Sequence, residues 1–395
     1  MAEPVKVKPE AMAGGGEPPS FTVDGNRLTP LTRGRERLEA LIALIAGAKH
    51  SLRLLYYIYS DDEAGARVRD ALGEAIGRGV EVRLIVDGFG SALPADYFAG
   101  LEAGGADICH FLPRFGRRYL LRNHQKLALA DEARAIIGGF NVSDDYFDDA
   151  HGWRDLGLLV EGPAAERLVG YFDALARWTH QEKPRLRELR RALSRWSQPK
   201  GGPVRWLFGG PMRRLSPWAA TVKRELQRAH RLDMIAAYFA PSPLMLRRIE
   251  GVATRGGEAR VLCPGKTDHA AAIAAARHTY ARLLRRGVAV YEYQQQKLHT
   301  KLFVIDDVVH IGSANFDMRS LFLNLELMLR VEDAGFARHM RRYFEGELAH
   351  SREITAAEHA RHGFLDRLRW AAAYFVMAVV DVSVTRRLNF GVDQT

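Results

Sequence analysis

Two stretches of this sequence repeat one another at a distance of roughly 175 residues. Residues 124–147 read HQKLALADEARAIIGGFNVSDDYF, and residues 299–326 read HTKLFVIDDVVHIGSANFDMRSLFLNLE. Both begin with His-x-Lys-x(4)-Asp, and in both a turn of small residues that ends in asparagine follows at a matching distance. The duplication predicts a chain made of two similar halves.

The segments that precede these two stretches are also alike. Each half opens with a helical pattern and a short apolar strand, in residues 35–60 and 220–242, and continues with a helix and an Arg-Gly-x-Glu-x-Arg strand. Helical patterns that alternate with short apolar strands indicate an α/β sheet. We therefore predict an α/β fold with two similar lobes, each a mixed sheet flanked by helices, packed face to face around one shared active site.

Composition suggests where the lobes begin and end. The N-terminal residues are rich in Pro, Gly and Glu, which is typical of a disordered tail. Between the two copies lies a stretch rich in Arg, Trp, Pro and Gly, which we interpret as a connection with a basic helix. The predicted parts are a disordered tail (1–20), the first lobe (21–182), the basic, Trp-containing interlobe connection (183–218), the second lobe (219–350) and a C-terminal helical segment (351–395).

Charge and cysteine content narrow the class of protein. The chain has 57 Lys and Arg against 47 Asp and Glu, a formal net charge of +10, which favours polyanionic partners such as nucleic acid, anionic lipid or phosphorylated substrates. Its two cysteines, Cys109 and Cys263, are too few for a disulfide-stapled secreted scaffold. Both lie in apolar, strand-like runs, so we expect small buried core residues.

Membrane contact is expected at the surface only. The N-terminus lacks the apolar core of a signal peptide, and the longest apolar run, WAAAYFVMAVV at 370–380, is too short to cross a bilayer. Arginines flank that run, so its helix either lies in a membrane interface or packs on the protein body. The basic helix at 185–196 is likewise either solvated or a membrane binder.

The duplicated motif places reactive side chains together. Successive residues of a strand alternate faces, so a His and a Lys two positions apart point the same way. The motif supplies two such pairs, which are His124 with Lys126 and His299 with Lys301. The motif acids, Asp131 and Asp306, fall in turn-like sequence after the apolar strand residues, so we expect them to be structural rather than reactive.

Two further residue types recur in each half. Asn141 and Asn315 end the small-residue turns, where an amide can donate to a phosphoryl oxygen. Asp155 and Glu326 occupy equivalent later positions. An imidazole that acts through one nitrogen needs a partner on the other nitrogen to fix its tautomer, and these two acids are the candidates for that role.

Together, these groups suit chemistry at a phosphodiester. Two ammonium groups and two amides would hold the anion and its transition-state charge without a metal ion or cofactor. A neutral imidazole can attack phosphorus, and a protonated one can give its proton to the leaving alkoxide. These roles predict opposite pKa shifts for the two histidines, away from about 6.5. A phosphohistidine would form and then pass its phosphoryl group to a second alcohol.

On these paired motifs the chain resembles the phospholipase D superfamily, and most closely the short bacterial cardiolipin synthases that lack N-terminal transmembrane helices. Further pointers are LIVDGFGS (84–91), WRDLGLLVEGP (153–163), LCPGKTDH (262–269) and GSANFDMRS (312–320). The resemblance implies phospholipase D-like lobes and a phosphatidyl transfer from phosphatidylglycerol to a second lipid alcohol, with release of glycerol. It implies that His124 is the nucleophile, that His299 is the acid and base, and that Asp155 and Glu326 orient them.

The expected partners are anionic phospholipids, phosphatidylglycerol above all, at a peripheral site on the cytoplasmic face of a bacterial membrane, and no nucleic acid. The oligomeric state stays open. Two other functions remain: a hydrolase with the same two-histidine chemistry, acting on phospholipids or as a phosphodiesterase or nuclease, and a membrane-binding protein on an inactive scaffold. Intact His and Lys residues in both copies argue against the inactive scaffold.

Overall fold

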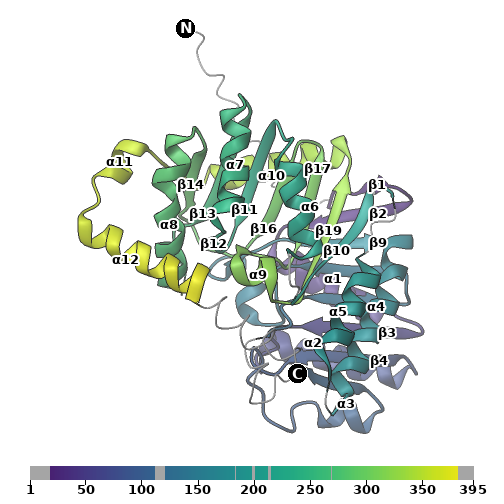
Figure 1. Ribbon diagram of the computed structural model, residues 1–395. Coiled ribbons are helices and arrows are strands. Elements are labelled where there is room, and N and C mark those ends of the chain that lie inside the picture. The colour runs from purple at the N-terminus through teal and green to yellow at the C-terminus, as the bar shows by residue number, and fades with distance from the viewer. Residues whose placement is uncertain are drawn as a thin grey trace.

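The first half of the chain forms a mixed sheet of eight strands, drawn in purple and blue in Figure 1. The computed structural model describes residues 18–111, 121–182, 184–197, 201–211, 215–267 and 269–380. The first sheet has the order β1 (Phe21–Val23), β2 (Asn26–Leu31), β9 (Gly157–Glu161), β7 (Arg134–Gly138), β6 (Leu127–Ala130), β3 (Ser51–Tyr56), β4 (Glu81–Asp87) and β5 (Asp107–Phe111). Strands β3, β4 and β5 are parallel, and the other neighbours are antiparallel.

The second half repeats this arrangement in a second eight-stranded sheet. Its order is β10 (Val204–Gly209), β19 (Glu326–Glu332), β17 (Val308–Gly312), β16 (Lys301–Ile305), β11 (Arg231–Ala236), β13 (Glu258–Pro264), β14 (Ala289–Tyr293) and β20 (Ser351–Ile354). Six consecutive strands, from β9 to β5 in the first sheet and from β19 to β14 in the second, follow the same order. The prediction of an α/β fold with two similar lobes, each with a mixed sheet and flanking helices, is confirmed.

Helices cover both sheets, and their first turns follow capping signals in the sequence. The first lobe carries α1 (Gly34–Ala46), α2 (Glu63–Gly77), α3 (Ala99–Ala103) and α4 (Pro163–His180), and the second carries α6 (Pro217–Leu226), α7 (Pro243–Thr254), α8 (Ala270–Arg285) and α10 (Ala334–Leu348). The Asp62 side chain accepts the Gly65 N–H at 2.9 Å and so begins α2. Ser242 caps α7 in the same way, with Pro243 at its first position.

The two lobes share one apolar core. A single cluster of buried side chains contains Leu127 and Ile137 from the first sheet, Leu302 and Ile311 from the second, and Phe172 from α4. Two further clusters lie on the outer faces, one under α1 and α2 and the other under α6, α7 and α8. The lobes also join through a short parallel pair, β8 (Trp153–Arg154) with β15 (Lys297–Leu298).

The predicted interlobe connection contains two regular elements. Helix α5 (Leu186–Trp196) is the basic helix expected from the sequence, and it buries Leu186, Leu189 and Leu193 in the shared core. Arg187, Arg191 and Arg195 are exposed, whereas Arg190 is half-buried and donates to the Pro211 carbonyl at 2.8 Å. Strand β10 then pairs with β19 at the edge of the second sheet. The second lobe therefore includes residues from Val204 onward, fourteen positions before the predicted end of the connection at 218.

The predicted C-terminal segment leaves the second lobe as a helical arm, yellow in Figure 1. After β20 come α11 (Ala356–Ala360), α12 (Phe364–Phe375) and a π-helical turn at Val376–Val380. Tyr374 donates to the Pro241 carbonyl at 2.6 Å and its ring packs on His278 of α8, which docks α12 on the lobe. Residues 381–395, and residues 1–17 of the predicted tail, lie outside the described residues. None of the helices in the described part of the chain is long and apolar enough to cross a bilayer.

Candidate active site

Each motif histidine is held by the opposite lobe. His124 lies just before β6, and its backbone N–H donates to the Leu325 carbonyl at 3.0 Å. His299 lies just before β16, and its N–H donates to the Arg154 carbonyl at 2.8 Å. Because Leu325 and Arg154 immediately precede Glu326 and Asp155, these two backbone bonds bring each histidine beside a carboxylate of the other half of the chain.

The carboxylates pair crosswise with the imidazoles. Nδ1 of His124 lies 3.1 Å from Oε2 of Glu326, and Nδ1 of His299 lies 2.7 Å from Oδ2 of Asp155. A carboxylate can only accept here, so each ring carries its proton on Nδ1 and leaves Nε2 with a lone pair. Both candidate orienting acids are fully buried and stand beside a histidine, one from each lobe.

Hydroxyl groups complete the surroundings of Glu326. Ser313 donates to the same Oε2 that meets His124, and Ser320 donates to Oε1 at 2.8 Å. Three polar groups, the His124 ring and the two serine hydroxyls, therefore hold this carboxylate in one rotamer. The sequence analysis passed over both serines, although Ser313 lies in the small-residue turn that it singled out.

Asp155 is held by charge and by a backbone donor. Its Oδ1 accepts the Leu156 N–H at 2.7 Å, and the buried guanidinium of Arg37 donates to its backbone carbonyl at 2.6 Å. Burial alone would raise the pKa of Asp155, but Lys301 and His299 together hold that pKa below its ordinary value. Asp155 is therefore an anion over the whole working range of pH.

The two lysines lie deep beside the histidines. Nζ of Lys126 donates to the His124 carbonyl at 2.6 Å, and Nζ of Lys301 donates to the His299 carbonyl and lies 2.8 Å from that ring's Nδ1. Burial lowers the pKa of Lys126 to about 7 and that of Lys301 to about 8. Burial weakens the affinity of both lysines for their protons. A bound anion would stabilise their charged forms.

The two histidines are shifted in the same direction. Burial and then Lys126 lower the pKa of His124, while burial and then Lys301 lower that of His299 to about 3. The expectation of opposite shifts is therefore wrong for the unliganded site. Burial is the main reason, because it disfavours the charged form of either ring, and the two ammonium groups close by disfavour a third positive charge further. A bound anion would add the negative charge that lets one ring hold a proton.

One cavity of 570 Å³ contains both histidines. It is lined from both lobes, by His124, Asn141, His299 and Asn315 among others. The side-chain oxygen of Asn141 accepts the Ile58 N–H at 3.0 Å, which leaves its amide N–H₂ as the donor. The side-chain oxygen of Asn315 is buried and without a hydrogen-bond partner among the described residues.

Several cavity residues escaped the sequence analysis. Aromatic rings flank the histidines: Tyr57 lies 5.1 Å from His124, and Trp153 lies 5.2 Å from His299, between ring centroids. Arg122 and Arg319 add cationic groups to the cavity wall. The guanidinium of Arg122 stacks 3.7 Å over the exposed ring of Phe89. The nearest sequence signal was the position of each arginine within five residues of a motif residue or turn asparagine.

The motif acids lie away from the cavity, in the hairpin turns. Asp131 accepts backbone N–H groups from residues 49–51, and Asp306 accepts those of His230 and Arg231. Both acids have left-handed backbone angles, with φ of 49° and 48°, which Asp tolerates better than most residues. Asp131 therefore ties its turn to the start of β3, and Asp306 ties its turn to the start of β11. Both contacts fit a structural role.

The comparison with family models gives the class of the protein. The family described as "Cardiolipin synthase, PLD-like domain" matches residues 41–176 and 222–348, one stretch in each lobe. The chain belongs to this family of phospholipase D-like proteins.

Individual proteins with similar sequences are named as cardiolipin synthases, in agreement with the family match. The chain is 31% identical over 342 residues to cardiolipin synthase 1 of Bacillus anthracis, covering 82% of this chain and 67% of the relative. It is 29% identical over 371 residues to cardiolipin synthase A of Pseudomonas aeruginosa, covering 91% and 74%. For cardiolipin synthase 2 of Bacillus anthracis the identity is 32%, and the coverage is 82% and 65%. The chain thus spans about two thirds of the length of the two Bacillus relatives.

Solved structures extend the likeness of fold. The crystal structure of phosphatidylserine synthase from Haemophilus influenzae aligns with a TM-score of 0.67 at 13% identity, over 92% of this chain and 94% of that one. Polyphosphate kinase from Porphyromonas gingivalis aligns with a TM-score of 0.55 at 15% identity, over 84% and 49%. Both confirm the two-lobed architecture.

Gly139 lies against Asp155 and offers a test of the pairing between Asp155 and His299. A Cβ on Gly139 would overlap both carboxylate oxygens of Asp155, so Gly139→Ala must displace the group that orients His299. We expect kcat/KM to fall about tenfold to a hundredfold, because small displacements of a positioned group cost that much. Gly100→Ala is the control, since a Cβ there meets nothing within 4 Å. Equal kinetics of the two variants would contradict this placement of Asp155.

Proposed function

We propose that this protein transfers a phosphatidyl group from phosphatidylglycerol to the hydroxyl of a second lipid alcohol, as a cardiolipin synthase does. The observation that carries the proposal is the pair of buried histidines in one cavity, each with Nδ1 on a carboxylate of the opposite lobe. The family and the relatives named cardiolipin synthase supply the substrate class.

The proposed reaction has two displacements at phosphorus. Nε2 of His124 attacks, a P–N bond forms, and the P–O bond to glycerol breaks as His299 gives its proton to the departing oxygen. His299 then accepts the proton of the incoming lipid hydroxyl, whose oxygen attacks phosphorus and breaks the P–N bond. The order of the two histidines comes from the resemblance to the superfamily, because their pKa shifts point the same way.

The remaining groups hold charge and substrate. Lys126, Lys301 and the amide of Asn141 would bind the non-bridging oxygens, whose charge grows as phosphorus becomes five-coordinate. The unpartnered side-chain oxygen of Asn315 would accept a hydrogen bond from an alcohol, which fits a hydroxyl leaving or entering on that side. The chain's own side chains thus supply the attack, the proton transfer and the charge stabilisation.

The test is a product analysis. Purified protein would be incubated with phosphatidylglycerol vesicles, with and without EDTA, and the lipids identified by mass spectrometry. Cardiolipin together with free glycerol is the expected result. Phosphatidic acid without cardiolipin would establish the hydrolase instead, and cleavage of DNA without any change in the lipids would overturn the lipid assignment.

The pKa values of the two lysines predict an alkaline limit to activity. Lys126 and Lys301, with pKa values of about 7 and about 8, lose their positive charge as pH rises through that range. We therefore expect kcat/KM, which reports the free enzyme, to fall as pH rises from about 7, and to fall more steeply above about pH 8. The alkaline decline of kcat should lie at higher pH than that of kcat/KM, because the bound anion raises the pKa values of both lysines. A kcat/KM that stays level to pH 10 would contradict the assignment.

We place the protein at the cytoplasmic face of the membrane as a peripheral enzyme, with α12 as a contact. Its Phe364 and Leu365 side chains are 76% and 78% exposed, and Leu368, Phe375 and Val376 are more than half exposed. Trp370 is buried on the opposite side of the same helix. A helix docked by one face and apolar on the other fits an interface between water and lipid.

Replacing that apolar face tests the placement. In a variant with Phe364, Leu365 and Leu368 changed to serine, we expect at least tenfold weaker binding to phosphatidylglycerol vesicles by flotation, since three exposed apolar side chains that would enter the lipid are lost. The activity on a short-chain phosphatidylglycerol below its micelle concentration is the control and should stay within twofold. Undiminished flotation would mean that α12 is not a membrane contact.

A further inference from the structure

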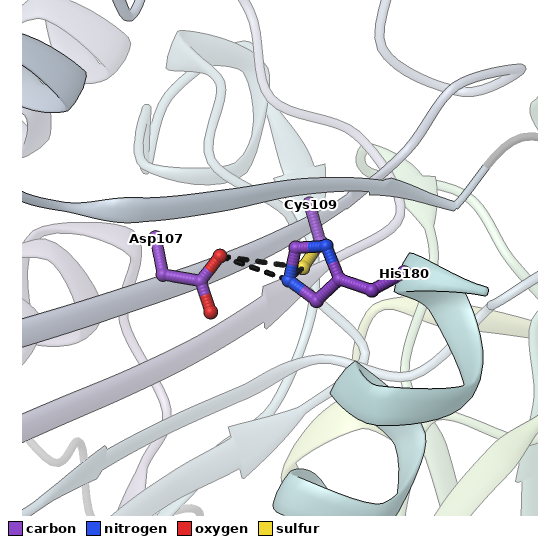
Figure 2. Close-up of side chains that lie close together, drawn as sticks. All are labelled: Asp107, Cys109 and His180. Atoms are coloured by element: carbon purple, nitrogen blue, oxygen red, sulfur yellow. Dashed lines mark hydrogen bonds and ion pairs between the residues drawn. The ribbon is translucent and has the colours of Figure 1, made fainter. Parts of the chain in front are cut away.

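A second group of reactive side chains lies at the edge of the first sheet. Asp107 and Cys109 lie on β5, the edge strand, and His180 is the last residue of α4 (Figure 2). The three side chains converge although His180 is more than seventy positions along the chain from the other two. None of them lines the active-site cavity.

The contacts meet at one ring nitrogen. Nε2 of His180 lies 2.9 Å from Sγ of Cys109 and 2.9 Å from Oδ1 of Asp107, and those two atoms lie 3.9 Å apart. In a Cys–His–Asp nucleophile relay the thiol and the carboxylate would occupy opposite nitrogens of the ring. Here both meet Nε2, and the one proton that this nitrogen carries cannot serve both. The arrangement therefore differs from that of a nucleophile and its base.

We propose that Asp107, Cys109 and His180 bind one divalent transition-metal ion of the Zn²⁺ type. Thiolate, imidazole and carboxylate are the three donors that such an ion takes in proteins. The three ligand atoms lie within 4.8 Å of one another, and this is the one group of its kind in the part of the chain that the structure describes. A tetrahedral zinc site needs donor separations of about 3.3–3.6 Å. Small rotations of the side chains, which lengthen the two 2.9 Å contacts and shorten the 3.9 Å one, would reach that range.

Burial supports a site open on one side. Cys109 is 4% exposed and comes from within the sheet, whereas the Asp107 and His180 side chains are 40% and 51% exposed. Asp107 and Cys109 point the same way because they are two apart on a strand. Three protein ligands with solvent on the outer side leave the fourth position to water.

The ion would join two elements at the border of the lobe. β5 ends the sheet, and α4 covers it, with the Phe111 and Trp178 rings 5.7 Å apart. A metal bridge between β5 and the last turn of α4 would fix this edge, whose outer strand has one neighbour in the sheet. Binding to the folded state alone would raise the midpoint of thermal unfolding.

The experiment uses full-length protein without a histidine tag, stripped of metal with a chelator and then titrated with Zn²⁺ and, separately, Co²⁺. We expect one high-affinity Zn²⁺ per chain and, with Co²⁺, the charge-transfer absorption of a metal–thiolate bond. Cys109→Ser should abolish that absorption. Cys109→Ser and His180→Ala should each weaken Zn²⁺ binding at least tenfold and remove the rise in unfolding midpoint.

The second cysteine is a matched control. Cys263 is also buried, and burial raises its pKa to about 12 as it does for Cys109. Cys263→Ser should bind Zn²⁺ like the parent protein. Binding that survives in both Cys109→Ser and His180→Ala, or Co²⁺ binding without thiolate absorption, would overturn the site and assign the ion to surface histidines. His180→Ala keeps the test decisive if Cys109→Ser fails to fold, because His180 is half exposed.

Discussion

Replacing either His124 or His299 with alanine is expected to lower the rate of phosphatidyl transfer at least about a thousandfold. In the proposed mechanism, His124 forms the bond to phosphorus and His299 moves the proton, and no other histidine in the described part of the chain lines the cavity beside them except His269. The measurement is the initial rate of cardiolipin formation on phosphatidylglycerol vesicles. His151→Ala is the control, because that imidazole is 90% exposed and lies outside the cavity.

The two variants should also differ from each other. With a substrate whose leaving group needs no proton, such as a nitrophenyl phosphodiester, His299→Ala should still release one equivalent of nitrophenol and accumulate phosphohistidine. His124→Ala should release none. The reverse pattern would exchange the two roles, and substantial turnover of phosphatidylglycerol by either variant would refute the two-histidine mechanism.

Neutralising either orienting carboxylate should lower the rate about a hundredfold to ten-thousandfold. In Asp155→Asn or Glu326→Gln an amide replaces the acceptor at Nδ1, and the ring loses the partner that fixes its tautomer and stabilises its positive form. Glu161→Gln and Glu332→Gln are matched controls, because both acids lie six residues after the orienting acids and outside the cavity.

The crosswise pairing predicts which step each variant impairs. Glu326→Gln should slow formation of the phosphohistidine on His124, and Asp155→Asn should slow proton transfer by His299. In double-mutant cycles, Asp155 should therefore couple to His299 and Glu326 to His124. Coupling of Asp155 to His124 instead would contradict the pairing in the structure.

The repeat predicted much of this architecture, because matching patterns along one chain must build matching folds. It also singled out Asp155 and Glu326, but not which histidine each one meets. That pairing depends on how the lobes pack, and the cluster that packs them draws on Leu127, Ile137 and Leu302, whose apolar character fits any buried face. The repeat therefore predicted which residues the candidate site contains, but not how the acids and histidines pair.

Other features of the structure had weak signals in the sequence, or none. Cys109 is a buried core residue, as the sequence predicts, but an alternating Asp-x-Cys in a strand says nothing of a histidine seventy-one positions later. Strand β10 was placed in a connection, since its sequence is short and follows a run of Gly and Pro. The direction of the histidine pKa shifts needed the burial of both lysines, which depends on contacts between the lobes.

The crosswise pairing of each histidine with a carboxylate of the other half has a consequence for the ancestry of the chain. Expressed alone, either half would hold an imidazole and lack the acid that meets it, because that acid belongs to the sister segment. A single ancestral copy would thus have worked only as a symmetric pair of subunits. Within one chain, neither copy can be lost or exchanged by itself without leaving a histidine that lacks its acid.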